Sequence, residues 1–368
     1  MSTNTALIEK REELKRRLAA GEYKTLVDIF LEGTDRLIRK ITRHPQPISP
    51  WYSSMMLYLI VLLLAFAGLF LIGEAPAFMK QFATFSAAFV PLSLFVGYFN
   101  VASIVAGNIY IHRVFTTFHE SVVDTIESIT SLDDFERWLD AVCNRRMHFV
   151  FSIVGGVFVG IYQISVLNAT GINVLLSTAI GTILLNTFSI VFLYLLIYMI
   201  VLSARLGKYH LKLYTAYPAG SEVITRLADL LGSFVYLVAF YATLLTLIVA
   251  IQQLLIPLGA LVILLFWIPI LGMFILNQSS LSSIIQRSKW KALNGIQAKV
   301  EQLHSSEKLG EKDTMETINR LMDYYDRIKN TRSSRIDLGA VLNLINSLLL
   351  PLLALVLGNI DKILALLK

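Results

Sequence analysis

Charged residues are scarce in this chain, and their scarcity excludes an ordinary soluble domain. Asp, Glu, Lys and Arg make up 16% of the 368 residues, whereas a soluble domain carries about 25%. Apolar residues reach 55%. The deficit is concentrated in long stretches that contain none of the four charged residue types, which is typical of segments that lie in lipid. The composition therefore predicts a membrane protein.

Cysteine is almost absent as well. Cys143 is the one cysteine of the chain, which excludes an internal disulfide framework and a cysteine-cluster metal site. Arg145 and Arg146 follow it closely, and neighbouring positive charge can lower a thiol pKa. We nevertheless expect an inert thiol on a helix, because no histidine or second cysteine clearly accompanies it.

Motifs for enzymatic chemistry are missing. The sequence contains no Gly-rich phosphate loop, HExxH, GxSxG or CxxC. No two histidines are three or four residues apart, so a helical metal pair is absent. We expect no enzymatic activity, no catalytic residue, no metal and no cofactor, and we expect the histidines to be interfacial or solvated. They are His44, His112, His119, His148, His210 and His304.

Uncharged runs divide the middle of the chain into six predicted membrane spans. A bilayer core about 30 Å thick requires roughly 20 apolar residues in a helix. Each of the two longest runs holds two spans, with a polar break, marked by Gly or Pro, at its centre. The runs are Tyr52 to Gly73, Phe82 to Arg113, Met147 to Ala204 with a break at 168–173, and Leu230 to Gln286 with a break at 252–257.

A seventh uncharged segment, Leu338 to Ile360, lies near the C-terminus. Its length matches a membrane crossing, although a re-entrant or interfacial helix is the alternative. On a helix, Asn343 and Ser347 are four residues apart and Asn346 is adjacent to them, so they form a polar strip beside a Leu-rich face. Several such helices around an axis would line a pore. An amphipathic helix resting on the membrane surface explains the same strip equally well.

Hydrophobic residues recur at helical spacing in the charged segments too. This pattern predicts amphipathic helices before the first span, in the loop that contains Ser131 and Asp134, and after the sixth span. Ser131 and Asp134 have the spacing of a capping box at a helix start. After the sixth span, one series is followed by a polar break and a second series, which predicts a helical hairpin. The two series are Leu293, Ile296, Val300 and Leu303, and then Met315, Ile318, Leu321, Met322, Tyr325 and Ile328.

The predicted fold is therefore all-α: a polytopic membrane helix bundle of six spans plus a seventh near the C-terminus, with helical cytoplasmic extensions. Residues 1–50 form amphipathic N-terminal helices, and residues 51–277 form the six-span bundle with a helical cytoplasmic loop at 113–146. Residues 278–336 form a coiled-coil-like cytoplasmic hairpin, and residues 337–368 form a membrane-spanning or interfacial helix.

The distribution of Lys and Arg predicts how the chain is oriented in the membrane. They cluster before the first span, in the loop after the second span and in the loop after the fourth, whereas the opposite loops carry only Lys80. We expect a multi-pass protein of the plasma or bacterial inner membrane with a cytoplasmic N-terminus. The net charge of +6 then faces anionic lipid headgroups. No nucleic-acid partner is expected, because no basic stripe with interleaved aromatic residues is present.

The predicted spans contain uncharged polar residues but no ionisable residue at the middle of the first six. This absence disfavours a proton-coupled transporter and an intramembrane protease. Gly156 and Gly160 have the spacing of a close helix–helix contact, to which Gly155 adds. We expect the polar side chains to form contacts within the membrane bundle; they are Asn100, Asn108, Gln163 and Asn186.

These features predict an oligomeric channel or channel-like receptor, gated through its helical cytoplasmic domain and lined by the C-terminal polar helix. The expected partners are the lipid bilayer, further copies of the chain, and a small ion or small-molecule ligand of unknown identity. A secondary transporter or permease for a neutral or amphipathic solute is one alternative, and a non-catalytic membrane scaffold is another. In its layout of seven spans, an internal N-terminus and a long charged stretch before a polar last span, the chain resembles the insect chemoreceptor superfamily. The resemblance is one of layout and carries no residue assignments.

Overall fold

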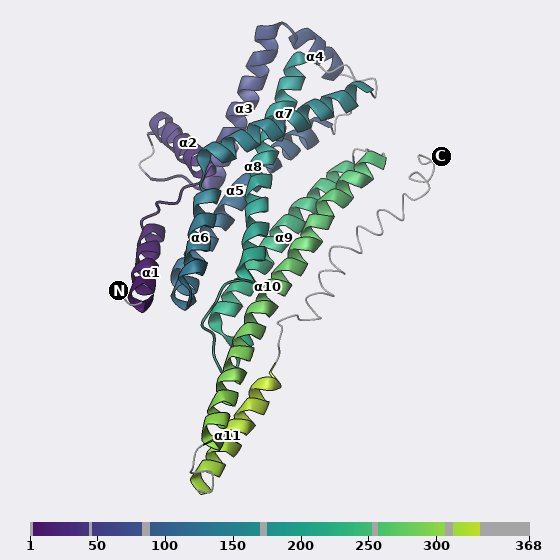
Figure 1. The fold of residues 1–368 in the computed structure, drawn as a ribbon. Coiled ribbons are helices and arrows are strands. Elements are labelled where there is room, and N and C mark those ends of the chain that lie inside the picture. Colours follow the sequence, from purple (N-terminus) through teal and green to yellow (C-terminus); the bar gives the residue numbers. More distant parts are fainter. Residues whose placement is uncertain are drawn as a thin grey trace. The chain divides into compact units, whose positions relative to one another are not determined.

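A computed structural model describes residues 3–43, 46–82, 89–169, 175–251, 257–305 and 312–331 (Figure 1). Within these ranges the chain forms eleven α-helices and no β-strand, which confirms the expected all-helical class. The C-terminal segment expected to line a pore, with Asn343, Asn346 and Ser347, lies outside the described residues, and so does the turn expected at 252–256.

Five helices are long and apolar enough to cross a membrane, and they correspond to the first, third, fourth, fifth and sixth predicted spans. The candidate spans are Pro50–Ile72 in α3, Arg145–Ser165 in α7, Ala179–Leu206 in α8, Glu222–Thr243 in α9 and Trp267–His304 in α10. Helix α3 also leaves Leu63, Phe70 and Leu71 more than two-thirds exposed. Exposed apolar surface of this extent is typical of a membrane-facing helix, so the helices indicate association with a membrane.

The second predicted span, Phe82 to Arg113, overlaps α5, Phe89–Thr117, which begins after residues outside the described part of the chain and is not among the five candidate spans of the described residues. The helices have the following bounds: α1 Thr3–Ala19, α2 Leu26–Thr42, α3 Pro50–Ile72, α4 Ala75–Phe82, α6 Ile129–Val142, α7 Arg145–Ala169, α8 Leu176–Leu206, α9 Glu222–Ile251, α10 Pro257–His304 and α11 Lys312–Lys329.

The chain divides into two compact units. The first unit comprises Met1–Arg16, Val114–Phe135 and the chain from Ile200 onward, and the second comprises Arg17–Arg113 and Glu136–Met199. Helices α1, α5, α6 and α8 each contribute residues to both units.

In the first unit, α10 packs along α9 and then continues into a hairpin with α11 (Figure 1). Helix α10 has 48 residues, which corresponds to a length of about 72 Å at 1.5 Å per residue. A bilayer core is about 30 Å thick, so α10 is long enough to cross it and extend well beyond. The boundary expected between bundle and hairpin at residue 277 therefore falls inside one continuous helix.

The hairpin between α10 and α11 has its own small apolar core. Leu293, Ile296 and Ile328 are at most 7% exposed. Val300 of α10 and Leu321 and Tyr325 of α11 pack against them, partly buried. Part of each apolar series in the sequence thus meets between the helices, whereas Met315 and Met322 of the second series are exposed.

In the second unit, α7 and α8 make their closest approach at two glycines of α7. A Cβ atom at Gly156 would lie 2.5 Å from the Cα of Thr187, and one at Gly160 would lie 2.9 Å from the Cα of Ile183. Real side chains do not tolerate such distances from backbone atoms, so only glycine permits this packing.

One expectation about local structure is wrong. Helix α6 begins at Ile129, so Ser131 and Asp134 do not form a capping box at its start. The Ser131 hydroxyl instead accepts a hydrogen bond from the backbone N–H of His210 at 3.4 Å. His148, one of the histidines expected to be interfacial or solvated, is fully buried within the protein. Its ring stacks on Tyr194 with 4.1 Å between centroids, a contact typical of packed aromatic side chains.

Candidate functional site

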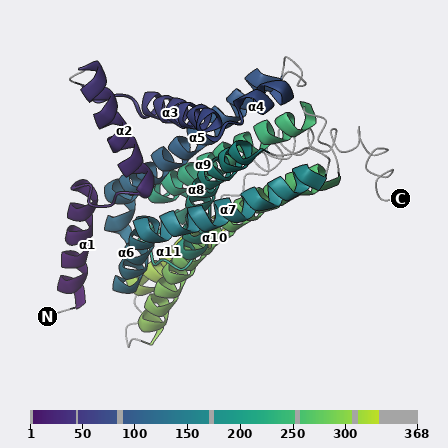
Figure 2. The same ribbon diagram turned by 90° about the horizontal axis from the view of Figure 1, so that it is seen from above.

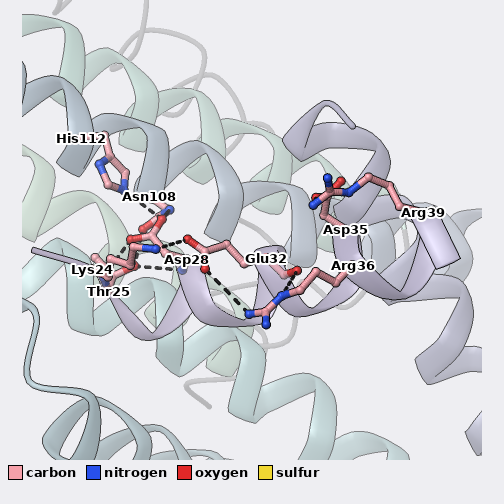
Figure 3. Close-up of polar contacts among 9 residues, drawn as sticks. All are labelled: Lys24, Thr25, Asp28, Glu32, Asp35, Arg36, Arg39, Asn108 and His112. Atoms are coloured by element: carbon pink, nitrogen blue, oxygen red, sulfur yellow. Dashed lines mark hydrogen bonds and ion pairs between the residues drawn. The ribbon is translucent and has the colours of Figure 1, made fainter. Parts of the chain in front are cut away.

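A cluster of four polar side chains joins α2 to α5 within the second unit (Figure 3). We call it the Asp28 cluster, and it consists of Thr25, Asp28, Asn108 and His112. Thr25 and Asp28 lie at the start of α2, and Asn108 and His112 lie one helical turn apart on α5. The cluster therefore links two helices that are about 80 residues apart in sequence.

The local sequence explains why Asp28 is in place. Thr25 is the N-cap of α2, and its hydroxyl accepts a hydrogen bond from the Asp28 backbone N–H at 3.2 Å. In return, the Asp28 carboxylate accepts one from the Thr25 backbone N–H at 2.8 Å. This reciprocal capping box holds the carboxylate in the first turn of the helix, where the helix dipole favours negative charge.

Donors from Thr25, Asn108 and His112 converge on the Asp28 carboxylate. Asn108 Nδ2 donates to Oδ1 at 2.7 Å, and His112 Nε2 lies 2.8 Å from the same oxygen. The Thr25 backbone N–H donates to Oδ2 at 2.8 Å. The Thr25 hydroxyl has one hydrogen, and it lies within donating distance of both Asp28 Oδ2, at 3.0 Å, and Asn108 Oδ1, at 2.6 Å. Thr25 and Asn108 therefore contact each other as well as Asp28.

These contacts favour the ionised form of Asp28. Burial raises the pKa of the Asp28 carboxyl, but the hydrogen bond and charge of His112 and the hydrogen bonds from Asn108 and Thr25 outweigh it. The net result is a pKa below the ordinary value for aspartate. The carboxylate therefore stays charged well below neutral pH.

The Asp28 cluster is suited to holding α2 against α5. Thr25 is fully buried, so its hydroxyl has no access to a substrate. His112 contacts the carboxylate and is itself 44% exposed at its side chain. The Asp28 side chain is 14% exposed. Its hydrogen bonds fix the position of α2 against α5, because removing any partner would leave a desolvated polar group.

The charged side of α2 continues past the cluster (Figure 3). Glu32 pairs with Lys24 at 2.5 Å and with Arg36 at 3.9 Å, and Asp35 pairs with Arg39 at 2.5 Å. Asp35 Oδ1 also accepts a hydrogen bond from the backbone N–H of Ile48 at 3.0 Å. This bond holds the linker to α3 against the middle of α2.

A second polar contact closes the α10–α11 hairpin in the first unit. Lys289 of α10 is 7% exposed, and its Nζ donates to the carbonyl oxygens of Lys329 and Thr331, each at 2.7 Å. A positive charge is favourable at the C-terminal end of a helix, where carbonyl groups lack partners. We call this contact the Lys289 clamp. It fixes the point where the chain leaves α11.

The four polar residues expected within the membrane bundle have different partners. Asn186 Nδ2 of α8 donates to Gln163 Oε1 of α7 at 2.8 Å. Ser189 of α8 donates to Asn100 Oδ1 of α5 at 3.4 Å. These contacts join predicted spans. Asn108, in contrast, contacts α2, which precedes the first span.

Cys143 lies in surroundings that suppress thiolate formation. Burial, followed by the nearby Asp28 and Asp140 carboxylates, raises the pKa of the Cys143 thiol to about 12 despite the opposing effect of Arg145. The thiol is therefore protonated at neutral pH and weakly reactive.

Asp28 and Lys289 were not among the sequence-predicted site residues, although each carries a signal. Thr25 and Asp28 have the same capping-box spacing as Ser131 and Asp134. Lys289 precedes Leu293 by four residues and Ile296 by seven, so it lies on the apolar face of its helix. A lysine on such a face indicates a buried partner.

The described residues form an all-helical protein in which five helices are long and apolar enough to cross a membrane. No protein-family model, curated protein or solved structure matches the chain.

Proposed function

We propose that the chain forms an oligomeric membrane channel or channel-like receptor that is gated through its helical cytoplasmic domain. The observation that carries the proposal is the continuity of α10. One helix contains a candidate membrane span and also the first arm of the hairpin with α11. A movement of the hairpin is therefore transmitted to the membrane without an intervening loop.

The Lys289 clamp supports the same proposal. It holds the backbone of Lys329 and Thr331, a few residues before the C-terminal segment that we propose as the pore helix. Because α10 is continuous and the end of α11 is held by Lys289, a movement of the hairpin would also move that C-terminal segment. Channel gating requires such a coupled element with two arrangements.

Apolar side chains on the hairpin support assembly of several copies. Trp290, Met315 and Met322 are 53%, 47% and 39% exposed. In an oligomer, neighbouring hairpins would cover these side chains, which favours association through the hydrophobic effect. The pore would then lie on the symmetry axis, lined by Asn343, Asn346 and Ser347.

Purified full-length protein in planar bilayers and liposomes tests the proposal. We expect passive ion conductance, and we expect Asn343→Leu together with Asn346→Leu to abolish it while the protein still elutes as the same oligomer. Saturable solute exchange without conductance would contradict the channel and indicate a transporter. If the protein shows neither conductance nor exchange, the scaffold alternative would be favoured.

The Lys289→Met variant tests the gating mechanism. It removes both clamp hydrogen bonds while keeping most of the side-chain volume, so we expect an altered open probability with unchanged single-channel conductance. Lys291→Met is the matched control, because Lys291 is exposed and pairs only at the surface with Glu127 at 2.6 Å. Equal gating in both variants and the wild type would contradict a role for the clamp.

A further inference from the structure

Helix α2 has two adjacent apolar stripes, and only one of them packs against the protein. Val27, Thr34 and Ile38 form the buried stripe. The exposed stripe consists of Phe30, Leu37 and Ile41, each three residues further along, and these side chains are 50%, 47% and 71% exposed. Both stripes have the spacing of seven and four residues that keeps side chains on one face.

Basic residues are concentrated at the C-terminal end of α2, where the exposed stripe ends. Arg36, Arg39, Lys40 and Arg43 lie in this part of the chain, and no acidic residue occurs between 36 and 43. Asp35 pairs with Arg39, whereas Arg36 is 71% exposed at its side chain and lies 3.9 Å from Glu32. An apolar stripe flanked by arginine and lysine is typical of helices that lie in a membrane surface.

The start of α3 continues this surface. Trp51 and Tyr52, at the first turn of the helix, are 44% and 67% exposed, and exposed Trp and Tyr are enriched where a span meets the headgroups. Helix α2 runs at an angle to α3 instead of extending its axis (Figures 1 and 2). The hydrogen bond from Ile48 to Asp35 keeps the intervening linker folded onto α2.

We propose that α2 is an interfacial helix whose exposed stripe inserts among lipid acyl chains while Arg36, Lys40 and Arg43 bind anionic lipid headgroups. The inference rests on the insertion of α3 in the membrane and is independent of channel activity. A second copy of the same helix fits the surface less well, because pairing would bring these basic residues together. The Asp28 cluster fixes α2 to α5, so the headgroup-binding helix is joined to a second membrane-region helix.

Fluorescence quenching in nanodiscs tests the proposal on the full-length chain with Cys143→Ser. A bimane label is attached at Leu37→Cys, with Ile41→Cys as a second stripe position. The matched control is Glu32→Cys, which lies on the opposite face of α2. We expect shallow doxyl-labelled lipids to quench the stripe labels and iodide in solution to leave them unquenched, with the reverse pattern at Glu32.

The headgroup part of the proposal is tested by changing the lipid. Replacing part of the phosphatidylcholine with phosphatidylglycerol should increase the lipid quenching at Leu37. Each basic side chain near an anionic surface shifts the partition equilibrium about fivefold. The combined variant Arg36→Gln, Lys40→Gln and Arg43→Gln should therefore remove the dependence on phosphatidylglycerol.

Two results would overturn the inference. If iodide quenches the stripe labels and doxyl lipids do not, α2 lies away from the membrane. If neither quencher reaches them, protein covers the stripe, either a second copy or another partner. Equal lipid quenching with and without phosphatidylglycerol would overturn the headgroup contact.

Discussion

Asp28 illustrates how a single side chain can hold a helix in place. Its carboxylate completes the cap of its own helix and accepts hydrogen bonds from Asn108 and His112 of α5. A charge as shielded from solvent as that of Asp28, whose side chain is 14% exposed, is stable only when such partners are present. The residue therefore contributes both to the start of α2 and to its attachment.

The Asp28→Ala substitution should destabilise the second unit. It leaves Asn108 and the Thr25 backbone without an acceptor, at a cost of about 1–3 kcal/mol. Thermal unfolding can be followed through the loss of helical circular dichroism. Glu32→Ala is the control, since exposed ion pairs contribute only about 0–1 kcal/mol. Equal midpoints for the two variants would contradict the fastening role.

The contribution of Asp28 should disappear in acid. The folded-state pKa of Asp28 lies below the ordinary value of 3.8, so the folded chain binds this proton more weakly than the unfolded chain does. The stabilisation is then fully present above 3.8 and is lost as the pH falls through the folded-state pKa. We expect the difference in midpoint between the wild type and Asp28→Asn to shrink as the pH falls through this range. If this difference in midpoint grows on acidification, the pKa of Asp28 is raised on folding and not lowered.

At the scale of helices, the close packing of α7 against α8 depends on glycine residues at the point where the two helices cross. The hydrophobic effect does not drive association between helices in lipid, so close backbone packing and polar contacts replace it. Gly156 and Gly160 permit the approach, and the hydrogen bond between Gln163 and Asn186 follows one turn further along.

The Gly156→Ala substitution should separate α7 from α8. The added Cβ would clash with the Thr187 backbone, and overpacking of this kind costs about 1–3 kcal/mol. Gly181→Ala on α8 is a matched control, because a Cβ there meets no atom within 4 Å and alanine favours the helix by about 1 kcal/mol. The thermal midpoint should fall for Gly156→Ala only. A fall in both variants would mean that the effect is not specific to the crossing.

The sequence predicts helices better than it predicts their partners. Uncharged runs locate α3, α7, α8, α9 and α10, because lipid excludes charge over the full length of a span. The sequence does not predict the hydrogen-bond partners of Asn108 and Lys289, because a polar side chain can form hydrogen bonds with any element that the fold places next to it. Ser131 shows the same limit: the capping-box spacing occurs there and at Thr25, and only the surrounding backbone decides which one caps a helix.

At the scale of the whole molecule, the account depends on the five apolar helices crossing a membrane. Their length and composition are suited to a crossing, and the distribution of Lys and Arg along the sequence predicts which helix ends face the cytoplasm. The proposed channel, its gating through α10 and the headgroup-binding surface of α2 all assume this topology.

Membrane-side labelling of α7 tests that assumption most directly. In the Cys143→Ser background, Arg146→Cys and Asn168→Cys place single thiols near the two ends of α7, which has 25 residues and thus a length of about 38 Å. A membrane-impermeant maleimide is applied to sealed vesicles of known orientation. We predict that the two positions react from opposite sides, with Arg146→Cys on the same side as Glu13→Cys near the N-terminus. Reaction of Arg146→Cys and Asn168→Cys from the same side would contradict the account.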